Sequence, residues 1–156
     1  MATKLLFFKG ISFVSKTIRL FTWGEYSHVG VLTDNDRLIE AWHLGGVVEN
    51  FLSQAPHTKG TVVDVYRILS DYDEKVFLSE LRAEVGKGYD YYGIVNFIRR
   101  KDSNNWNRWF CSELVHAKLA RAGALTLNAP CHKVNPTMLS YSPILSKTGT
   151  FKFGEL

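Results

Sequence analysis

A cysteine and a histidine suited to thiol catalysis lie in two separate segments of this chain, FCSELVHAKLARAG and YSHVGVL. Cys111 precedes an apolar stripe that predicts a helix, so it stands at the helix N-terminus. The positive end of the helix dipole and the unpaired backbone N–H groups there favour a thiolate and can hold a developing oxyanion. His28 alternates with Val29 and Val31 in a predicted strand and faces the opposite side. Together Cys111 and His28 predict acyl transfer by a thiol nucleophile with an imidazole base.

Glu40 is the candidate for the third polar group, which orients the imidazole of such a base. It stands in the apolar segment LIEAW, where a carboxylate must either face solvent or have a partner. The turn at 34–36 separates this segment from the strand of His28. Counting back from the turn puts Glu40 opposite residues 29–31, within reach of His28. Gly30 has no side chain and would let another backbone or a substrate approach closely.

Each candidate also has a purely structural interpretation, and rival residues are present. Cys111 could be a buried small residue, His28 a hydrogen-bonded strand histidine, and Glu40 a solvent-exposed side chain. Four other histidines compete for the role of base: His43, His57, His116 and His132. His116 lies five residues beyond Cys111 and is therefore rotated off the face of the helix that carries the cysteine. Cys131 and His132 are neighbours in a loop and form a weaker rival pair.

The order of the predicted elements indicates an α+β fold. Apolar residues at helical spacing predict helices over 11–21, 74–86 and 111–123, and Asn135-Pro136 has the form of a further helix start. The predicted strands cover 26–33, 37–42, 47–51 and 61–68, and 149–153 could add an edge strand. The segment 99–109, RRKDSNNWNRW, is typical of an exposed polar loop.

The composition is that of one globular domain, which we expect to span residues 1–156. A net charge of +4 favours anionic partners, but no long run of Lys and Arg indicates a specific nucleic-acid site. Two cysteines make no disulfide framework, so we expect two free thiols in a reducing compartment. No segment has the ~20 apolar residues of a spanning helix or the form of a secretory signal. We therefore expect a cytoplasmic protein, which would reach an extracellular substrate only if it were delivered, for example by a phage.

Four segments, in this order, resemble the NlpC-type papain-like cysteine hydrolases. They are YSHVGV, LIEAW, GKGYDYYG and FCSELVHAKLARAG, and with the helix before them they span about residues 10–124. The histidine segment comes before the cysteine segment. This order resembles the circularly permuted branch of that superfamily, which includes relatives of lecithin retinol acyltransferase.

The resemblance implies a papain-like α+β fold with a small antiparallel sheet packed against the helix that carries the nucleophile. It also implies roles for four residues: Cys111 as nucleophile, His28 as base, Glu40 as the third member, and Tyr89 as a group that stabilises the oxyanion. No metal or organic cofactor is implied. The basic loop before Cys111, with Arg99, Arg100, Lys101 and Arg108, departs from the family pattern and could frame a substrate groove.

Three functions are compatible with these residues. The first is a cysteine amidase or peptidase that cleaves a peptide or a peptidoglycan stem peptide through an acyl-enzyme. The second is a hydrolase or acyltransferase that acts on lipid or N-acyl substrates. The third is a catalytically inactive binding protein, in which the basic and aromatic residues of 99–109 contact an anionic partner. The complete set of His28, Glu40 and Cys111 argues against the third.

Overall fold

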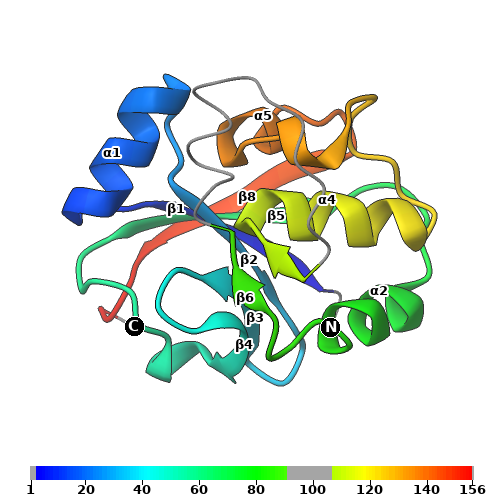
Figure 1. Cartoon of the computed structure of the whole chain (residues 1–156), viewed down its shortest axis with the longest axis horizontal. Helices are drawn as coiled ribbons and strands as arrows, with labels where there is room; N and C mark the ends of the chain where they lie inside the picture. Colours follow the sequence, from blue (N-terminus) through cyan, green and yellow to red (C-terminus); the bar gives the residue numbers. More distant parts are fainter. Residues whose placement is uncertain (1–2, 91–106, 156) are drawn as a thin grey trace.

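An antiparallel six-stranded sheet organises the computed structural model, which describes residues 3–90 and 107–155 (Figure 1). The strand order across the sheet is β4-β3-β2-β1-β5-β8. The strands are β1 (Lys4–Lys9), β2 (His28–Leu32), β3 (Arg37–Trp42), β4 (Gly46–Phe51), β5 (Val62–Ile68) and β8 (Leu145–Lys152). Two further short strands, β6 (Gly88–Tyr89) and β7 (Arg108–Trp109), pair with each other in parallel.

Four helices are described in the same ranges: α1 (Phe13–Thr22), α2 (Glu74–Arg82), α4 (Cys111–Arg121) and α5 (Pro136–Ser140). Two single turns of 3-10 helix, η1 (Leu52–Gln54) and η2 (Cys131–Lys133), complete the described elements. The sequence analysis predicted these helices and the strands β2 to β5 within a few residues, and the α+β class is confirmed. The predicted edge strand is also confirmed, since β8 lies at one edge of the sheet.

Strand β1 is central to the sheet, although the sequence analysis assigned no strand to residues 4–9. It pairs with β2 on one side and with β5 on the other. Its four apolar residues are fully buried, Leu5 and Phe7 against one face and Leu6 and Phe8 against the other. A strand that is buried on both faces has no alternation of apolar and polar residues, which is the pattern that indicates a strand.

The segment before Cys111 is also different from its prediction. Trp109 is buried in strand β7, where an exposed loop was expected. Its indole N–H donates to a buried carboxylate of Glu84, which explains how a residue from a polar segment reaches the interior. Arg99, Arg100 and Lys101, the proposed frame of a groove, lie outside the described residues, whereas Arg108 is exposed on β7.

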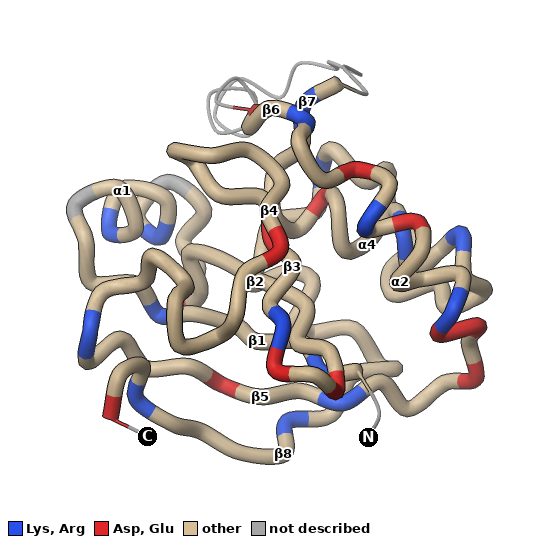
Figure 2. The backbone as a smooth tube through the Cα atoms, turned by 90° about the horizontal axis from the view of Figure 1, so that it is seen from below, with Lys and Arg blue, Asp and Glu red and all other residues tan. Residues whose placement is uncertain are grey.

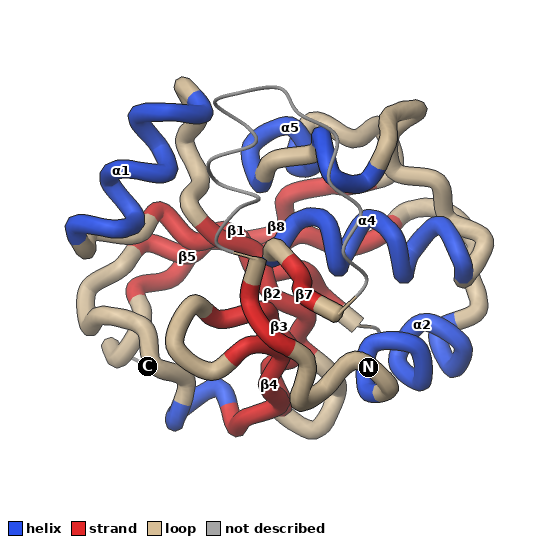
Figure 3. The backbone as a smooth tube through the Cα atoms, in the orientation of Figure 1, coloured by secondary structure: helices blue, strands red, loops and turns tan. Residues whose placement is uncertain are grey.

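The helices α2 and α4 lie on one face of the sheet, where α4 packs against β2 (Figures 1 and 3). The larger core cluster is on this face, and it includes Cys111, Val29 and Val31. A smaller cluster around Leu6, Phe8 and Leu38 covers the opposite face. Because the side chains of β2 alternate, His28 and Gly30 lie toward the smaller cluster.

Charged residues of both signs are spread over the described elements rather than gathered on one of them (Figure 2). Among the described residues, no helix has the length and apolar character needed to cross a membrane.

Candidate active site

The site begins with a pair of buried side chains, His28 on β2 and Glu40 on β3. The two strands pair antiparallel, with Val31 opposite Ile39. Continuing that register places Glu40 opposite Gly30, as the turn-counting argument predicted. From there the carboxylate oxygen Oε2 reaches the Nε2 atom of His28 at 2.6 Å. Solvent exposure of Glu40 is excluded, because it is 1% exposed.

Gly30 makes room for the His28–Glu40 pair, and the groups that approach it are side chains of the neighbouring strand. A Cβ atom at this position would lie 2.8 Å from Cδ1 of Leu38 and 3.4 Å from Cβ of Glu40. The neighbours that approach Gly30 therefore come from strand β3, whereas the sequence analysis suggested a distant backbone or a substrate. The missing side chain lets Glu40 lie across β2 toward His28.

A second histidine, His57, binds the same carboxylate oxygen. It lies in the loop between η1 and β5, and its Nε2 atom is 2.8 Å from Oε2 of Glu40. The ring stacks on Phe8, with centroids 3.9 Å apart and planes 12° apart, and it also contacts Trp42 edge to face. His57 was one of four competing histidines in the sequence. No local pattern distinguishes it, because its partners come from distant strands.

The charges of the cluster decide which nitrogen of His28 carries the proton. Burial disfavours the Glu40 carboxylate, but the hydrogen bonds from His28 and His57 outweigh it and lower the pKa of Glu40 to about 2. The ionised carboxylate only accepts hydrogen bonds, so both Nε2 atoms must be donors. Burial lowers the pKa of His28, even though Glu40 opposes this, so the ring is neutral at neutral pH. A neutral ring with Nε2–H has an unprotonated Nδ1, which is the form that acts as a base.

Cys111 is the first residue of α4 and lies against β2. Burial raises the pKa of Cys111 to about 12, and it outweighs the nearby backbone N–H groups of Val29 and Ser112, which favour the thiolate. The expectation that the helix N-terminus makes Cys111 a thiolate is therefore wrong for this state, because burial is the larger effect. Within the described residues, no hydrogen bond joins Cys111 to His28. Cys111 shares the larger core cluster with Val29, the neighbour of His28.

Buried polar contacts fix the segment that leads into α4. Glu84 accepts hydrogen bonds from the indole of Trp109 at 2.8 Å and from the ammonium of Lys118 at 2.6 Å. These contacts attach β7 and α4 to the end of α2. Tyr89 of β6 pairs with Trp109 in register and lies with its ring 6.0 Å from that of Phe110. Tyr89 is thus buried close to the start of the cysteine helix.

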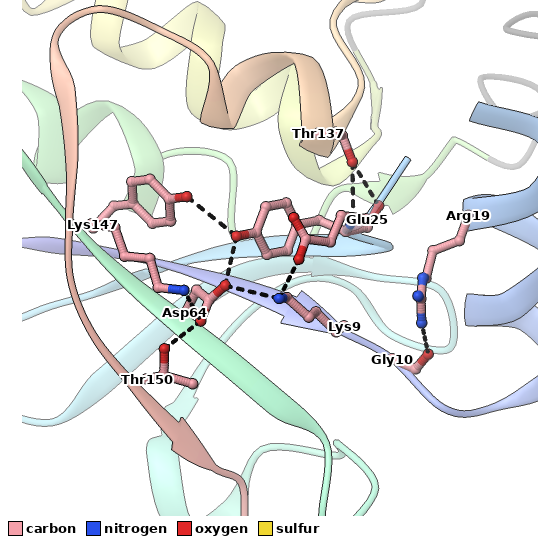
Figure 4. Close-up of polar contacts among 10 residues, drawn as sticks. Lys9, Gly10, Arg19, Glu25, Asp64, Thr137, Lys147 and Thr150 are labelled. Atoms are coloured by element: carbon pink, nitrogen blue, oxygen red, sulfur yellow. Dashed lines mark hydrogen bonds and ion pairs between the residues drawn. The ribbon is translucent and has the colours of Figure 1, made fainter. Parts of the chain in front are cut away.

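A second buried network fixes the residues just before His28 (Figure 4). The carboxylate of Asp64 accepts a hydrogen bond from the hydroxyl of Tyr26 at 2.6 Å and pairs with Lys9 at 3.3 Å and Lys147 at 2.8 Å. The backbone N–H of Tyr26 donates to Thr137 at 2.9 Å. These contacts tie the start of β2 to β1, β5, β8 and α5. They lower the pKa of Asp64 despite its burial, so the network contains an ionised carboxylate.

The rival residues are placed elsewhere. His116 is buried, and its ring contacts Thr126 and the backbone carbonyl of Ala129. Cys131 and His132 share the turn η2 beside α4, where Cys131 is partly exposed. Both cysteines are free thiols, as expected. Of the proposed site residues, the structure joins His28 directly to Glu40, and it places Cys111 at the start of α4 against β2 and Tyr89 beside Phe110.

Fold and site together describe an α+β protein with a buried His–carboxylate pair beside a helix-terminal cysteine. Among solved structures, the chain is similar to the metalloprotein yiiX from Escherichia coli O157:H7, with a TM-score of 0.70 and 22% sequence identity over 96% of each chain. At this identity the similarity shows a shared fold alone. No family model matches the chain, and no curated protein matches it.

Proposed function

We propose that this chain is a cysteine hydrolase with a circularly permuted papain-like fold, in which Cys111 is the nucleophile and His28 the base. The buried hydrogen bond between Nε2 of His28 and Oε2 of Glu40, at 2.6 Å, is the observation that carries the proposal. The ionised Glu40 accepts a hydrogen bond from Nε2–H of His28, so Nδ1 of the neutral ring carries no proton and can accept one. Val29 follows His28 directly, and its backbone N–H lies near enough to the sulfur of Cys111 to favour the thiolate.

The raised pKa of the thiol indicates how the first step proceeds. Cys111 starts as a neutral thiol, and Nδ1 of His28 takes its proton while the sulfur attacks the carbonyl carbon. Glu40 stabilises the imidazolium that forms. His28 then gives the proton to the leaving amine, which leaves an acyl thioester on Cys111. In the second half, His28 deprotonates a water that attacks the thioester, and the thiolate of Cys111 leaves and takes that proton back from His28 as the acid is released.

The substrate that we propose is an amide, of a peptide or of a peptidoglycan stem peptide. One observation favours the second candidate, a lipid or N-acyl substrate. A cavity of about 410 Å³ lies beside His57, and apolar side chains line much of it, among them Ile11, Val14 and Leu44. Such a lining would accept an acyl chain better than a charged peptide.

The similar solved structure is described as a metalloprotein. In this chain the described residues that could hold a metal ion are His28, Glu40 and His57, so they include the proposed base itself. A metal ion there would act as a Lewis acid, and it would compete with the proton transfers of His28. The proposed thiol chemistry therefore requires that no metal ion is bound to His28.

The test is turnover of a panel of muropeptides, N-acyl amino acids and p-nitrophenyl esters. Cys111→Ser and His28→Gln are expected to remove hydrolysis of any substrate that the wild type cleaves. Cys131→Ser is the matched control, and it should retain the wild-type rate. Hydrolysis that survives Cys111→Ser, or that is lost only in Cys131→Ser, would contradict the proposal.

A further inference from the structure

Glu40 holds two imidazoles at one oxygen, while its other oxygen has no partner in the part of the chain that the structure describes. Oε2 is 2.6 Å from Nε2 of His28 and 2.8 Å from Nε2 of His57. Oε1 is fully buried and makes no hydrogen bond. A carboxylate oxygen left unpaired in the interior is costly, and it needs an explanation beyond the orientation of His28.

The three side chains form a donor set for a metal ion. Their ligand atoms all lie within 4.8 Å of one another. Two imidazole nitrogens and a carboxylate oxygen are typical ligands of Zn²⁺, with bonds of about 2.0–2.2 Å. Ligands at that bond length stand roughly 3.3 Å apart around a tetrahedral ion. The carboxylate of Glu40 would therefore move away from each ring by about half an ångström, and its unpaired Oε1 would become available to the ion.

The surroundings of His57 offer a route for an ion. His57 is carried by a loop and not by the sheet, and it lines the 410 Å³ cavity together with Trp42 and His43. The rigid strands β2 and β3 supply the other two ligands. The site thus combines two fixed ligands with one on a loop beside a cavity.

We propose that His28, Glu40 and His57 form a binding site for a divalent metal ion of the zinc class, and that the bound ion switches off the base of the hydrolase. The inhibitory half of this inference rests on the proposed function. The metal site itself does not, because it depends only on the three side chains.

The switch follows from the proton on His28. Without metal, the neutral ring carries its proton on Nε2 and donates it to Glu40, so Nδ1 can accept the proton of Cys111. A metal ion needs the lone pair of Nε2, so the proton moves to Nδ1 and the ring stays neutral. The nitrogen that should take the thiol proton is then already protonated. Metal binding and base catalysis are therefore mutually exclusive at His28.

The experiment titrates the full chain, stripped of metal with a chelator, with zinc chloride in a calorimeter and with cobalt chloride in a spectrophotometer. We expect one ion per chain and a Co²⁺ absorption typical of nitrogen and oxygen ligands. His57→Gln and Glu40→Gln should each weaken binding by at least about 10-fold to 100-fold, since loss of a ligand costs at least as much as loss of an outer partner. The matched controls His43→Gln, beside the cavity, and Cys131→Ser, at the other thiol, should bind as the wild type does.

The tautomer is read in the wild type, so this readout does not depend on how a variant folds. Nitrogen-15 correlation spectra of labelled histidine should show Nε2–H for His28 in the stripped protein and Nδ1–H after addition of zinc. Zinc should also slow alkylation of Cys111 in the wild type but not in His57→Gln. No zinc binding in the wild type, binding that survives both ligand variants, or an unchanged tautomer would overturn the metal site. A third result separates the two proposals: zinc binds as described, but the rate of alkylation of Cys111 does not depend on His28. In that case the proposed function fails, and the inhibitory half of the inference fails with it. The metal site would still stand.

Discussion

Replacing Glu40 with Gln tests the electrostatic arrangement on which the site depends. The substitution keeps the shape of the side chain and an oxygen that can accept hydrogen bonds, but it removes the charge. In the wild type that charge receives hydrogen bonds from two buried histidines. The variant should therefore lose stability at neutral pH without losing its fold.

The pKa of Glu40 sets the expected magnitude. A carboxyl group whose pKa is lowered from 4.5 to about 2 by folding contributes about 3 kcal/mol to the free energy of unfolding at neutral pH. Because the folded pKa is lower than the unfolded one, this contribution is complete above about pH 5 and is lost as the pH falls toward 2. Below that pH the wild type carries a neutral carboxylic acid at position 40, which is nearly equivalent to Gln.

The assay is urea unfolding of both proteins at a series of pH values between 2 and 8. Glu40→Gln should be about 3 kcal/mol less stable at pH 7, and the two unfolding curves should converge near pH 2. Glu49→Gln is the matched control, because its carboxylate on the neighbouring strand binds the exposed Arg82 and should be worth less than about 1 kcal/mol. Equal stability at pH 7, or a difference that does not change with pH, would refute an ionised Glu40 held by two histidines.

Three further substitutions test other parts of the account. Gly30→Ala should lower the free energy of unfolding by about 1–3 kcal/mol and slow alkylation of Cys111, since the new Cβ would press on Leu38 and displace Glu40; wild-type stability by urea titration would contradict the crowding. Asp64→Asn should destabilise by about 2–3 kcal/mol, because Tyr26 and two lysines lose a charged partner, and an unchanged thermal midpoint would show that the network does not support β2. Burial raises the pKa of Glu113 to about 7, so its ionisation opposes folding as the pH rises from 4.5 through 7. Glu113→Gln should therefore be about 3 kcal/mol more stable than the wild type at pH 8 and equal to it at pH 4, and denaturation curves that show the same difference at both pH values would exclude this assignment.

Features that depend on neighbouring residues in the chain were predicted well. Asn135 caps α5 just before Pro136, as the Asn-Pro pattern predicted. The register of Glu40 was also predictable, because a tight turn fixes the pairing of the two strands that it joins.

Features that depend on distant residues were not predictable from local patterns. Strand β1 lacks alternation of apolar and polar residues because neighbours cover both of its faces. His57 contacts Glu40 and Phe8 only because its loop folds back onto these two residues from distant strands. The ionised state of the Cys111 thiol was predicted from the helix dipole, which is a local effect. Burial among residues of several elements reverses that prediction, because desolvation of a charge exceeds the effect of a helix end.

The central claim, that Cys111 attacks and His28 takes its proton, is tested most directly by trapping the acyl-enzyme. The wild type is incubated with the best substrate of the panel, quenched in acid within seconds, digested and analysed by mass spectrometry. The account predicts the acyl mass on the peptide that contains Cys111, much less of it in His28→Gln, and none on Cys131. Hydrolysis without any adduct on Cys111, or an adduct that forms equally fast in His28→Gln, would contradict the account.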